Sequence, residues 1–157
     1  MKANSLEGLI ADPALSGLQT SIRVDPVIEE MEALEDFTFR ILGPDRIPPL
    51  QYQKIEISVD EIFSNIVQYS CASFAEIVCE ADSKDIRIIF TDDGIPFDPL
   101  MIEEQPIMEV TPTGGQGIRI VKELMDRVDY CRKSNMNILT ITLKIQEDDE
   151  NGSNKNS

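Results

Sequence analysis

The order of hydrophobic patterns along the chain is the feature that most constrains its fold. Two segments, 25–42 and 48–68, place apolar residues at three- and four-residue steps, which predicts two amphipathic helices. Proline stands near the start of each, at Pro26 and Pro49, where a helix tolerates it. β-rich runs at 74–80 and 85–92 follow, joined by a turn at 82–84, and an earlier run at 18–24 predicts a first strand.

The rest of the chain predicts one more helix and a second hairpin. After a proline-containing loop, glycines lead into a short helix that ends near residue 126, and two last β-rich runs, 128–133 and 137–145, meet near Ser134. Together the elements predict an α/β two-layer sandwich, in which helices cover one face of a mixed, mostly antiparallel sheet. We expect one domain at 18–145, a poorly ordered segment at 1–17 and a disordered acidic tail at 146–157.

The helical periodicity also predicts which side chains face the core. The core side of the first helix is expected to carry Val27, Met31, Leu34, Phe37 and Ile41, and that of the second Ile55, Val59, Ile62, Phe63, Ile66 and Val67. A polar stripe runs beside the second set, made of Lys54, Ser58, Glu61, Asn65 and Gln68.

Charge and cysteine content exclude several classes of function. The net charge is −15, from 14 basic and 29 acidic residues, which argues against nucleic acid or an anionic membrane as the main partner. No apolar run approaches the roughly 20 residues that span a bilayer, and the N-terminus does not read as a secretion signal. Cys71, Cys79 and Cys131 form no CxxC pair, which predicts buried free thiols in a reducing compartment. We therefore expect a cytoplasmic protein.

The chain contains no histidine. This excludes Ser-His-Asp and Cys-His catalysis, a zinc site with histidine ligands, and a histidine that accepts a phosphoryl group. Any proton transfer must use a carboxylate, a lysine, a tyrosine or a cysteine.

The second helix carries a first candidate site, because Glu61 and Asn65 are four residues apart and share one helical face. An asparagine carbonyl oxygen suits a hard divalent cation such as Mg²⁺, which takes few protein ligands besides water and substrate phosphates. Glu61 could then accept a proton from a hydroxyl group or water. A solvated helix face is the alternative interpretation.

A second candidate follows the strand at 85–92, where Asp92, Asp93 and Gly94 precede Pro96. A carboxylate at the end of a strand can accept the exocyclic amino group of a purine, and a nearby glycine lets the backbone approach the ring. Asp-Gly before proline is also a favourable turn, so a plain turn remains the alternative.

A third candidate is the glycine-rich entrance of the short helix, from Thr113 through Gly114, Gly115 and Gly117. Glycines at a helix start leave the first-turn amides free to face an anion, and the helix dipole adds to the attraction. A flexible hinge is the alternative. The segment does not have the pattern of a Walker loop or of a Rossmann fingerprint.

In combination the three motifs are far more specific. Their order resembles the nucleotide site of the histidine-kinase-like ATPases, known as the Bergerat or GHKL fold. The sequences TDDGIPFDP and GGQGIRIVKELMDRVDY, followed by a hairpin that ends in NILTITLK, look most like the anti-sigma-factor serine/threonine kinases of that group. The resemblance covers roughly residues 22–145.

The resemblance implies a role for each motif residue. Asn65 matches the Mg²⁺-binding asparagine, Glu61 the proposed general base, and Asp92 the aspartate that binds adenine. The segment from about 98 to 113 would be the ATP lid. The positions that match nucleotide-binding residues are Asn65, Asp92, Gly94, Thr113, Gly114, Gly115 and Gly117.

The implied function is an ATP-dependent serine/threonine protein kinase that phosphorylates an anti-anti-sigma (STAS) protein and binds a sigma factor in an alternative complex. Homodimers are common in the family, although no surface patch for one can be read from this sequence. Gln68-Tyr69-Ser70 departs from the family pattern, Pro96 replaces a glycine, and the lid is short with few basic residues. The competing interpretation is therefore a non-catalytic module whose nucleotide state selects a partner.

Overall fold

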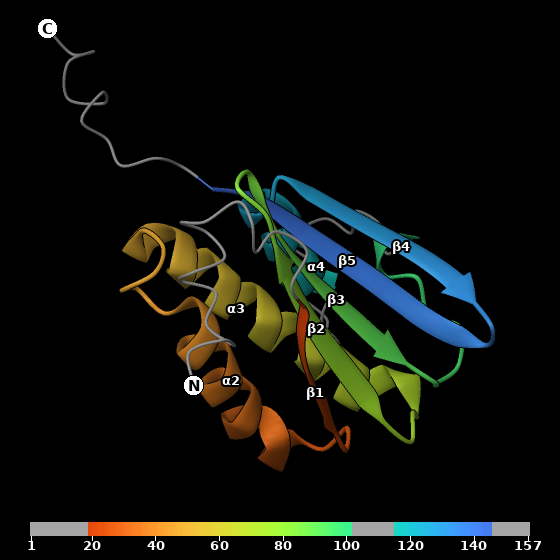
Figure 1. The fold of residues 1–157 in the computed structure, drawn as a ribbon. Coiled ribbons are helices and arrows are strands. Elements are labelled where there is room, and N and C mark those ends of the chain that lie inside the picture. The colour runs from red at the N-terminus through yellow and green to blue at the C-terminus, as the bar shows by residue number, and fades with distance from the viewer. Residues whose placement is uncertain (1–18, 102–114, 146–157) are drawn as a thin grey trace, which may run out of the picture.

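The computed structural model describes residues 19–101 and 115–145. Within these ranges five strands form one sheet in the order β1-β2-β3-β5-β4, and every neighbouring pair is antiparallel. Helices α2, α3 and α4 lie on the same side of this sheet (Figure 1), so the expected two-layer α/β sandwich is confirmed. The strands are β1 (Gln19–Val24), β2 (Ala75–Ala81), β3 (Asp85–Asp92), β4 (Arg127–Lys133) and β5 (Met136–Lys144); the helices are α2 (Met31–Leu42), α3 (Pro49–Asn65) and α4 (Gly115–Leu124).

The core lies between the helices and one face of the sheet. Burial alternates along β2, β3 and β5, because successive side chains of a strand point to opposite faces. The inner face of the central strands includes Ile77, Ile88 and Ile141, which pack against Leu34 and Phe63 of the helices. This buried apolar layer holds the ends of β3 and β5 at fixed positions, and the candidate site forms at those ends.

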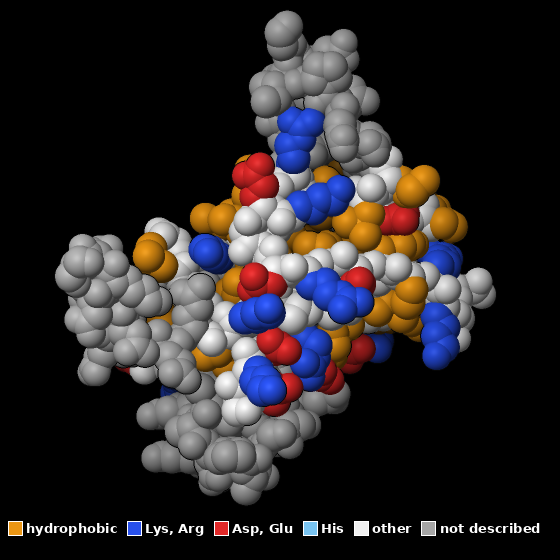
Figure 2. Space-filling model, turned by 90° about the horizontal axis from the view of Figure 1, so that it is seen from above, with side chains coloured by type: hydrophobic (Ala, Val, Ile, Leu, Met, Phe, Trp, Pro, Cys, Tyr) orange, Lys and Arg blue, Asp and Glu red, His pale blue; other side chains and the backbone are white. Residues whose placement is uncertain are grey.

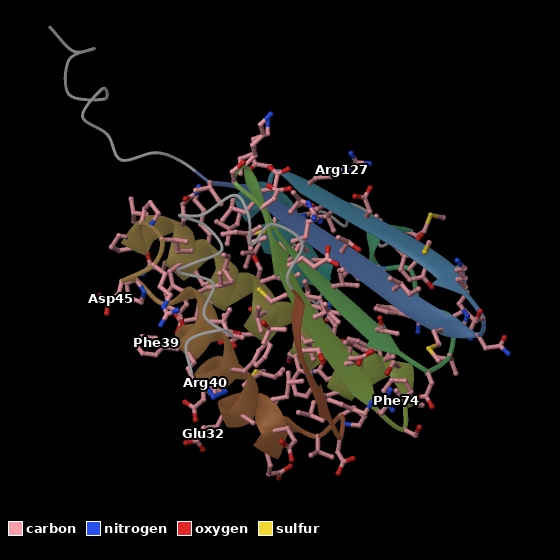
Figure 3. The ribbon with its side chains drawn as sticks, in the orientation of Figure 1. Glu32, Phe39, Arg40, Asp45, Phe74 and Arg127 are labelled. Carbon is pink, nitrogen blue, oxygen red and sulfur yellow. The ribbon has the colours of Figure 1, made fainter. Side chains whose placement is uncertain are left out.

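Two helical expectations are wrong in detail. The first helix does not begin at Pro26: a short 3-10 turn, η3 (Ile28–Glu30), precedes α2, and Val27 is 43% exposed instead of facing the core. Ser58 was expected on the polar stripe of α3 but is fully buried, and its hydroxyl oxygen has no hydrogen-bond partner among the described residues. Exposed positions on α2, such as Glu32 and Phe39, point away from the sheet (Figure 3).

Both expected hairpin turns form, each for a local reason. Asp82 Oδ1 accepts hydrogen bonds from the amides of Lys84 and Asp85, each 2.8 Å long, and this closes the β2–β3 turn. In the β4–β5 turn Ser134 and Asn135 both have positive φ, 54° and 62°, as a two-residue hairpin of the primed type requires.

The expectation of buried thiols is only partly correct. Cys79 lies in the core, where burial raises the pKa of its thiol to about 12, whereas Cys71 and Cys131 are free and exposed. The segments expected at 1–17 and 146–157 lie outside the described residues, as does the expected lid beyond Met101. No helix within residues 19–101 and 115–145 is long and apolar enough to cross a membrane.

Candidate functional site

A pocket with about 370 Å³ of empty space, part of it open to solvent, opens beside the end of α3. Its walls come from α3, the following π-helical turn η4 (Ile66–Ser70), the ends of β3 and β5, and the loop after β3. Most of the lining is apolar, and three of its polar residues, Asp92, Tyr130 and Asn137, are joined by hydrogen bonds. The lining residues are Ile62, Asn65, Ile66, Ser70, Phe90, Asp92, Phe97, Pro99, Tyr130, Asn137 and Leu139.

Asp92 is the acidic side chain of this lining, and it is only 4% exposed. Its Oδ1 accepts two hydrogen bonds, from the Gly94 amide at 2.9 Å and from Asn137 Nδ2 at 3.0 Å. Its Oδ2 accepts no hydrogen bond from any described residue. A carboxylate in a pocket wall with one oxygen engaged and the other uncommitted can accept a hydrogen bond from a ligand donor.

The loop after β3 is held against η4 at two points. Gly94 is buried, and a Cβ atom there would overlap the carbonyl oxygen of Ser70 and approach its carbonyl carbon to 2.7 Å. The next amide, of Ile95, donates to that same Ser70 carbonyl at 2.8 Å. Asp93 closes the other side, since its carboxylate accepts from the Ser73 amide at 2.7 Å and from the Ser73 hydroxyl. These bonds lower the pKa of Asp93 and keep it ionised.

The residues Gln68-Tyr69-Ser70, which depart from the family pattern, lie in the π-helical turn η4. The π-helical turn ends at Cys71, whose φ of 55° reverses the chain direction. It places the Tyr69 ring against Phe97, with ring centres 5.6 Å apart. Since Phe97 lines the pocket, Tyr69 supports the pocket wall from behind, a role that the sequence did not reveal.

Glu61 and Asn65 both lie on α3, half-buried, one turn apart. Asn65 lines the pocket, and its side chain makes no hydrogen bond to any described residue. Glu61 lies under the start of α4: a Cβ atom at Gly117 would overlap Glu61 Oε1 and approach its Cδ to 3.2 Å. The structure thus brings the first and third sequence motifs together, because α3 and α4 pack against each other.

The other residues of the glycine-rich motif lie partly inside and partly outside the described residues. Gly115 is the first residue of α4, whereas Thr113 and Gly114 lie outside the described residues. In the next turn, Ile118 and Val121 are buried in the core. The N-terminus of α4 is therefore anchored by its apolar side close to Glu61.

A cluster of acids lies along α3 next to this end of the site. Burial raises the pKa of Asp60 to about 7, and the neighbouring Glu35 of α2 adds to the shift through its charge and a hydrogen bond. Glu56 and Glu61 raise it further, and Asp60 Oδ1 is buried without a hydrogen-bond partner among the described residues. On the face of the molecule shown in Figure 2, by contrast, basic and acidic side chains are interspersed with apolar ones.

Comparison with known proteins identifies the domain. Residues 27–143 match the model of the histidine kinase-like ATPase domain. The chain belongs to this family. The histidine kinase-like ATPase domain thus accounts for most of its length, and the family name indicates an ATP-binding domain.

Two solved structures match this chain, and the first of them, with the higher TM-score, agrees with the family fold. The RsbU and RsbW domains of a protein from Mycobacterium tuberculosis match with a TM-score of 0.60 at 12% identity, covering 83% of this chain and 33% of that one. This chain thus spans about a third of that structure. The histidine kinase AdeS of Acinetobacter baumannii matches with a TM-score of 0.48 at 14% identity, covering 90% of this chain and 74% of that one. No curated protein matches the sequence.

Sequence reasoning missed two residues of the candidate site. Asn137 lines the pocket and bonds Asp92, and Tyr130 beside it donates its hydroxyl to Asn137 Oδ1 at 2.5 Å. Asn137 lies at a strand position where polar and apolar residues alternate, so only its burial, at 5% exposure, distinguishes it. The β3–β5 register, which pairs Asp92 with Asn137, decides this contact.

Proposed function

We propose that this domain binds ATP in the pocket beside α3 and transfers the γ-phosphoryl group to a serine or threonine of an anti-anti-sigma (STAS) partner. The observation that carries the binding proposal is the buried Asp92, whose Oδ1 is held by two donors while Oδ2 makes no bond within the described residues. An adenine amino group donates where this oxygen accepts. The apolar lining, which includes Phe90 and Leu139, suits a flat aromatic ring.

The phosphate groups would lie toward Asn65 and the start of α4. As at any helix start, the first backbone amides of α4 have no acceptor within the helix, and they lie at the positive end of the helix dipole. Gly115 and Gly117, together with Thr113 and Gly114 outside the described residues, form the proposed phosphate loop.

Mg²⁺ fits this arrangement through Asn65, whose carbonyl oxygen lies at the pocket wall with no protein partner among the described residues. Within the described ranges no group of three or more acidic or cysteine side chains is placed to hold a metal by itself. The ion would therefore take most of its ligands from phosphate and water, as Mg²⁺ usually does, and would neutralise phosphate charge.

Glu61 is the proposed general base. It would accept the proton of the substrate hydroxyl, whose oxygen attacks the γ-phosphorus while the bond to the ADP oxygen breaks. ADP then leaves with the bonding electron pair. Phosphoryl transfer depends mainly on positioning and charge neutralisation, so one carboxylate and a phosphate-binding helix end are sufficient protein groups.

The partner assignment rests on the motif resemblance to the anti-sigma-factor kinases and on a fold shared with a structure that contains an RsbW domain. We propose a sigma factor as the partner of the alternative complex and a homodimer as the working form. A cytoplasmic location is part of the same proposal.

Two variants test binding and transfer separately. Asp92→Asn should weaken ATP binding by about 100-fold in calorimetry, because the amide places a donor where adenine also donates. Glu61→Gln should leave affinity within about twofold and lower transfer of labelled phosphate to a STAS protein by at least about 100-fold. Unchanged ATP affinity in Asp92→Asn would contradict the assignment of this pocket as the ATP-binding site. Tight ATP binding without transfer to any STAS protein would instead support a non-catalytic, nucleotide-dependent binding module.

A further inference from the structure

Asn137 of β5 forms more hydrogen bonds than any other described side chain near the pocket. Its Nδ2 donates to Asp92 Oδ1 at 3.0 Å and to the Ile95 carbonyl at 2.8 Å. Its Oδ1 accepts from the Phe97 amide at 3.2 Å, from the Tyr130 hydroxyl at 2.5 Å and from the Arg132 guanidinium at 3.1 Å. One side chain therefore joins β3, β4, β5 and the loop after β3.

The two ends of this amide face groups of opposite character. A carboxylate and a carbonyl oxygen, both acceptors, surround the nitrogen, whereas an amide, a hydroxyl and a guanidinium, all donors, surround the oxygen. Both hydrogens of Nδ2 are used, so Asn137 has no donor left for a ligand. Rotating the amide would place donor against donor and acceptor against acceptor, which defines its orientation.

We infer that Asn137 is the positioning residue of the base-binding end of the site. By occupying Asp92 Oδ1 it leaves Oδ2 as the oxygen available to a ligand, and by holding Ile95 and Phe97 it sets the shape of the pocket wall. Arg132 extends the network, because the same nitrogen that reaches Asn137 also donates to the Gly94 carbonyl at 2.8 Å. This inference rests on the proposed binding of ATP.

The variant Asn137→Asp separates positioning from simple packing, because its shape is unchanged. Its carboxylate can still accept from Phe97, Tyr130 and Arg132, but its other oxygen then faces Asp92 Oδ1 and the Ile95 carbonyl. The carboxylates at positions 92 and 137 would then repel each other in a buried environment, and a proton shared between them would relieve the repulsion. The titratable and charged groups that face position 137 are Asp92 from β3 and Tyr130 and Arg132 from β4.

The experiment measures the dissociation constant of a fluorescent ATP analogue at about pH 6 and about pH 8, as the ratio of variant to wild type. Asn137→Asp should weaken binding about 100-fold at the higher pH and only about 10-fold at the lower one. Asn135→Asp is the control, because it adds the same charge in the exposed β4–β5 turn. Its ratio should be near one at both pH values.

Arg132→Gln should weaken binding of the ATP analogue a few-fold with no dependence on pH. An equal ratio for Asn137→Asp at both pH values, or affinity like the wild type, would overturn the inference.

Amide hydrogen exchange without nucleotide tests the network independently of ATP. In Asn137→Asp the Gly94 amide should lose protection as Asp92 reorients, while the Phe97 amide, whose acceptor is retained, should keep it. In Asn137→Leu the Gly94 and Phe97 amides should both lose protection. If the wild type binds no nucleotide and these exchange changes occur, the proposed function fails, and only the part of the inference in which Asn137 holds Asp92 stands. If ATP binds and Gly94 exchange is unaffected in both variants, the positioning role fails alone.

Discussion

The two ends of the proposed nucleotide site, called here the base end and the phosphate end, are built in different ways. At the base end, Asp92 is buried inside a network in which backbone amides and Asn137 satisfy one of its oxygens. At the phosphate end, Asp60 is partly buried beside three other acids, and one of its oxygens has no partner among the described residues. Hydrogen bonds therefore hold the Asp92 carboxylate in place, whereas the Asp60 carboxylate lies among other acidic side chains. This difference predicts that base-end changes disturb structure, while phosphate-end changes act through charge and side-chain position.

Gly94→Ala should have the largest effect on stability. The added methyl group would overlap the Ser70 carbonyl, and moving the two backbone segments apart would break the hydrogen bond from the Ile95 amide to that carbonyl. We expect the free energy of unfolding to fall by about 2–3 kcal/mol in urea denaturation, together with weaker ATP binding. A loss below about 0.5 kcal/mol would show that the base end is not rigid.

Asp60→Asn should give an intermediate effect that depends on pH. The folded-state pKa of about 7 lies above the ordinary aspartate value of 3.8, so between these pH values the folded protein retains a proton that the unfolded chain has lost. Asp60 therefore favours folding at acidic pH, and this contribution is lost as the pH rises from about 4 through 7. Since the group is partly solvated, we expect the neutral variant to be more stable by about 1–2 kcal/mol at pH 8 and little changed at pH 4.

Asp36→Asn is the matched control, because Asp36 is an exposed acid on α2. It should change stability by less than about 0.5 kcal/mol at both pH values. Equal stabilisation by the two variants would mean that net charge, and not the position of Asp60 between α2 and α3, causes the effect.

Gly117→Ala should have the smallest effect on stability and a clear effect on phosphoryl transfer. Its methyl group would meet the end of the Glu61 side chain, which can rotate away, so we expect a stability change below about 1 kcal/mol. Moving Glu61 should lower the transfer rate by about tenfold with little change in ATP affinity. A stability loss as large as that of Gly94→Ala would contradict the difference between the two ends.

Much of the fold could be predicted because it depends on local patterns. The helical periodicity around Leu34 and Phe63 identified two of the helices, and the turns at Asp82 and at Ser134 were correctly placed. The exposure of Val27 and the burial of Ser58 were not predictable, because both depend on where a helix begins relative to the sheet. The same holds for Asp60, whose raised pKa comes partly from Glu35 on another helix.

The sequence by itself determined the domain family and the candidate residues: a chain without histidine that carries Glu61, Asn65 and Asp92 in the order of the histidine kinase-like ATPase motifs. Spacing along one helix or one turn is enough for such inferences, because the interacting groups are close in the chain. Only the tertiary structure decided how these groups are held. The register of β3 with β5 brings Asn137 to Asp92, and the packing of α4 on α3 brings Gly117 to Glu61. Both contacts join residues that lie far apart in the sequence, so no local pattern records them.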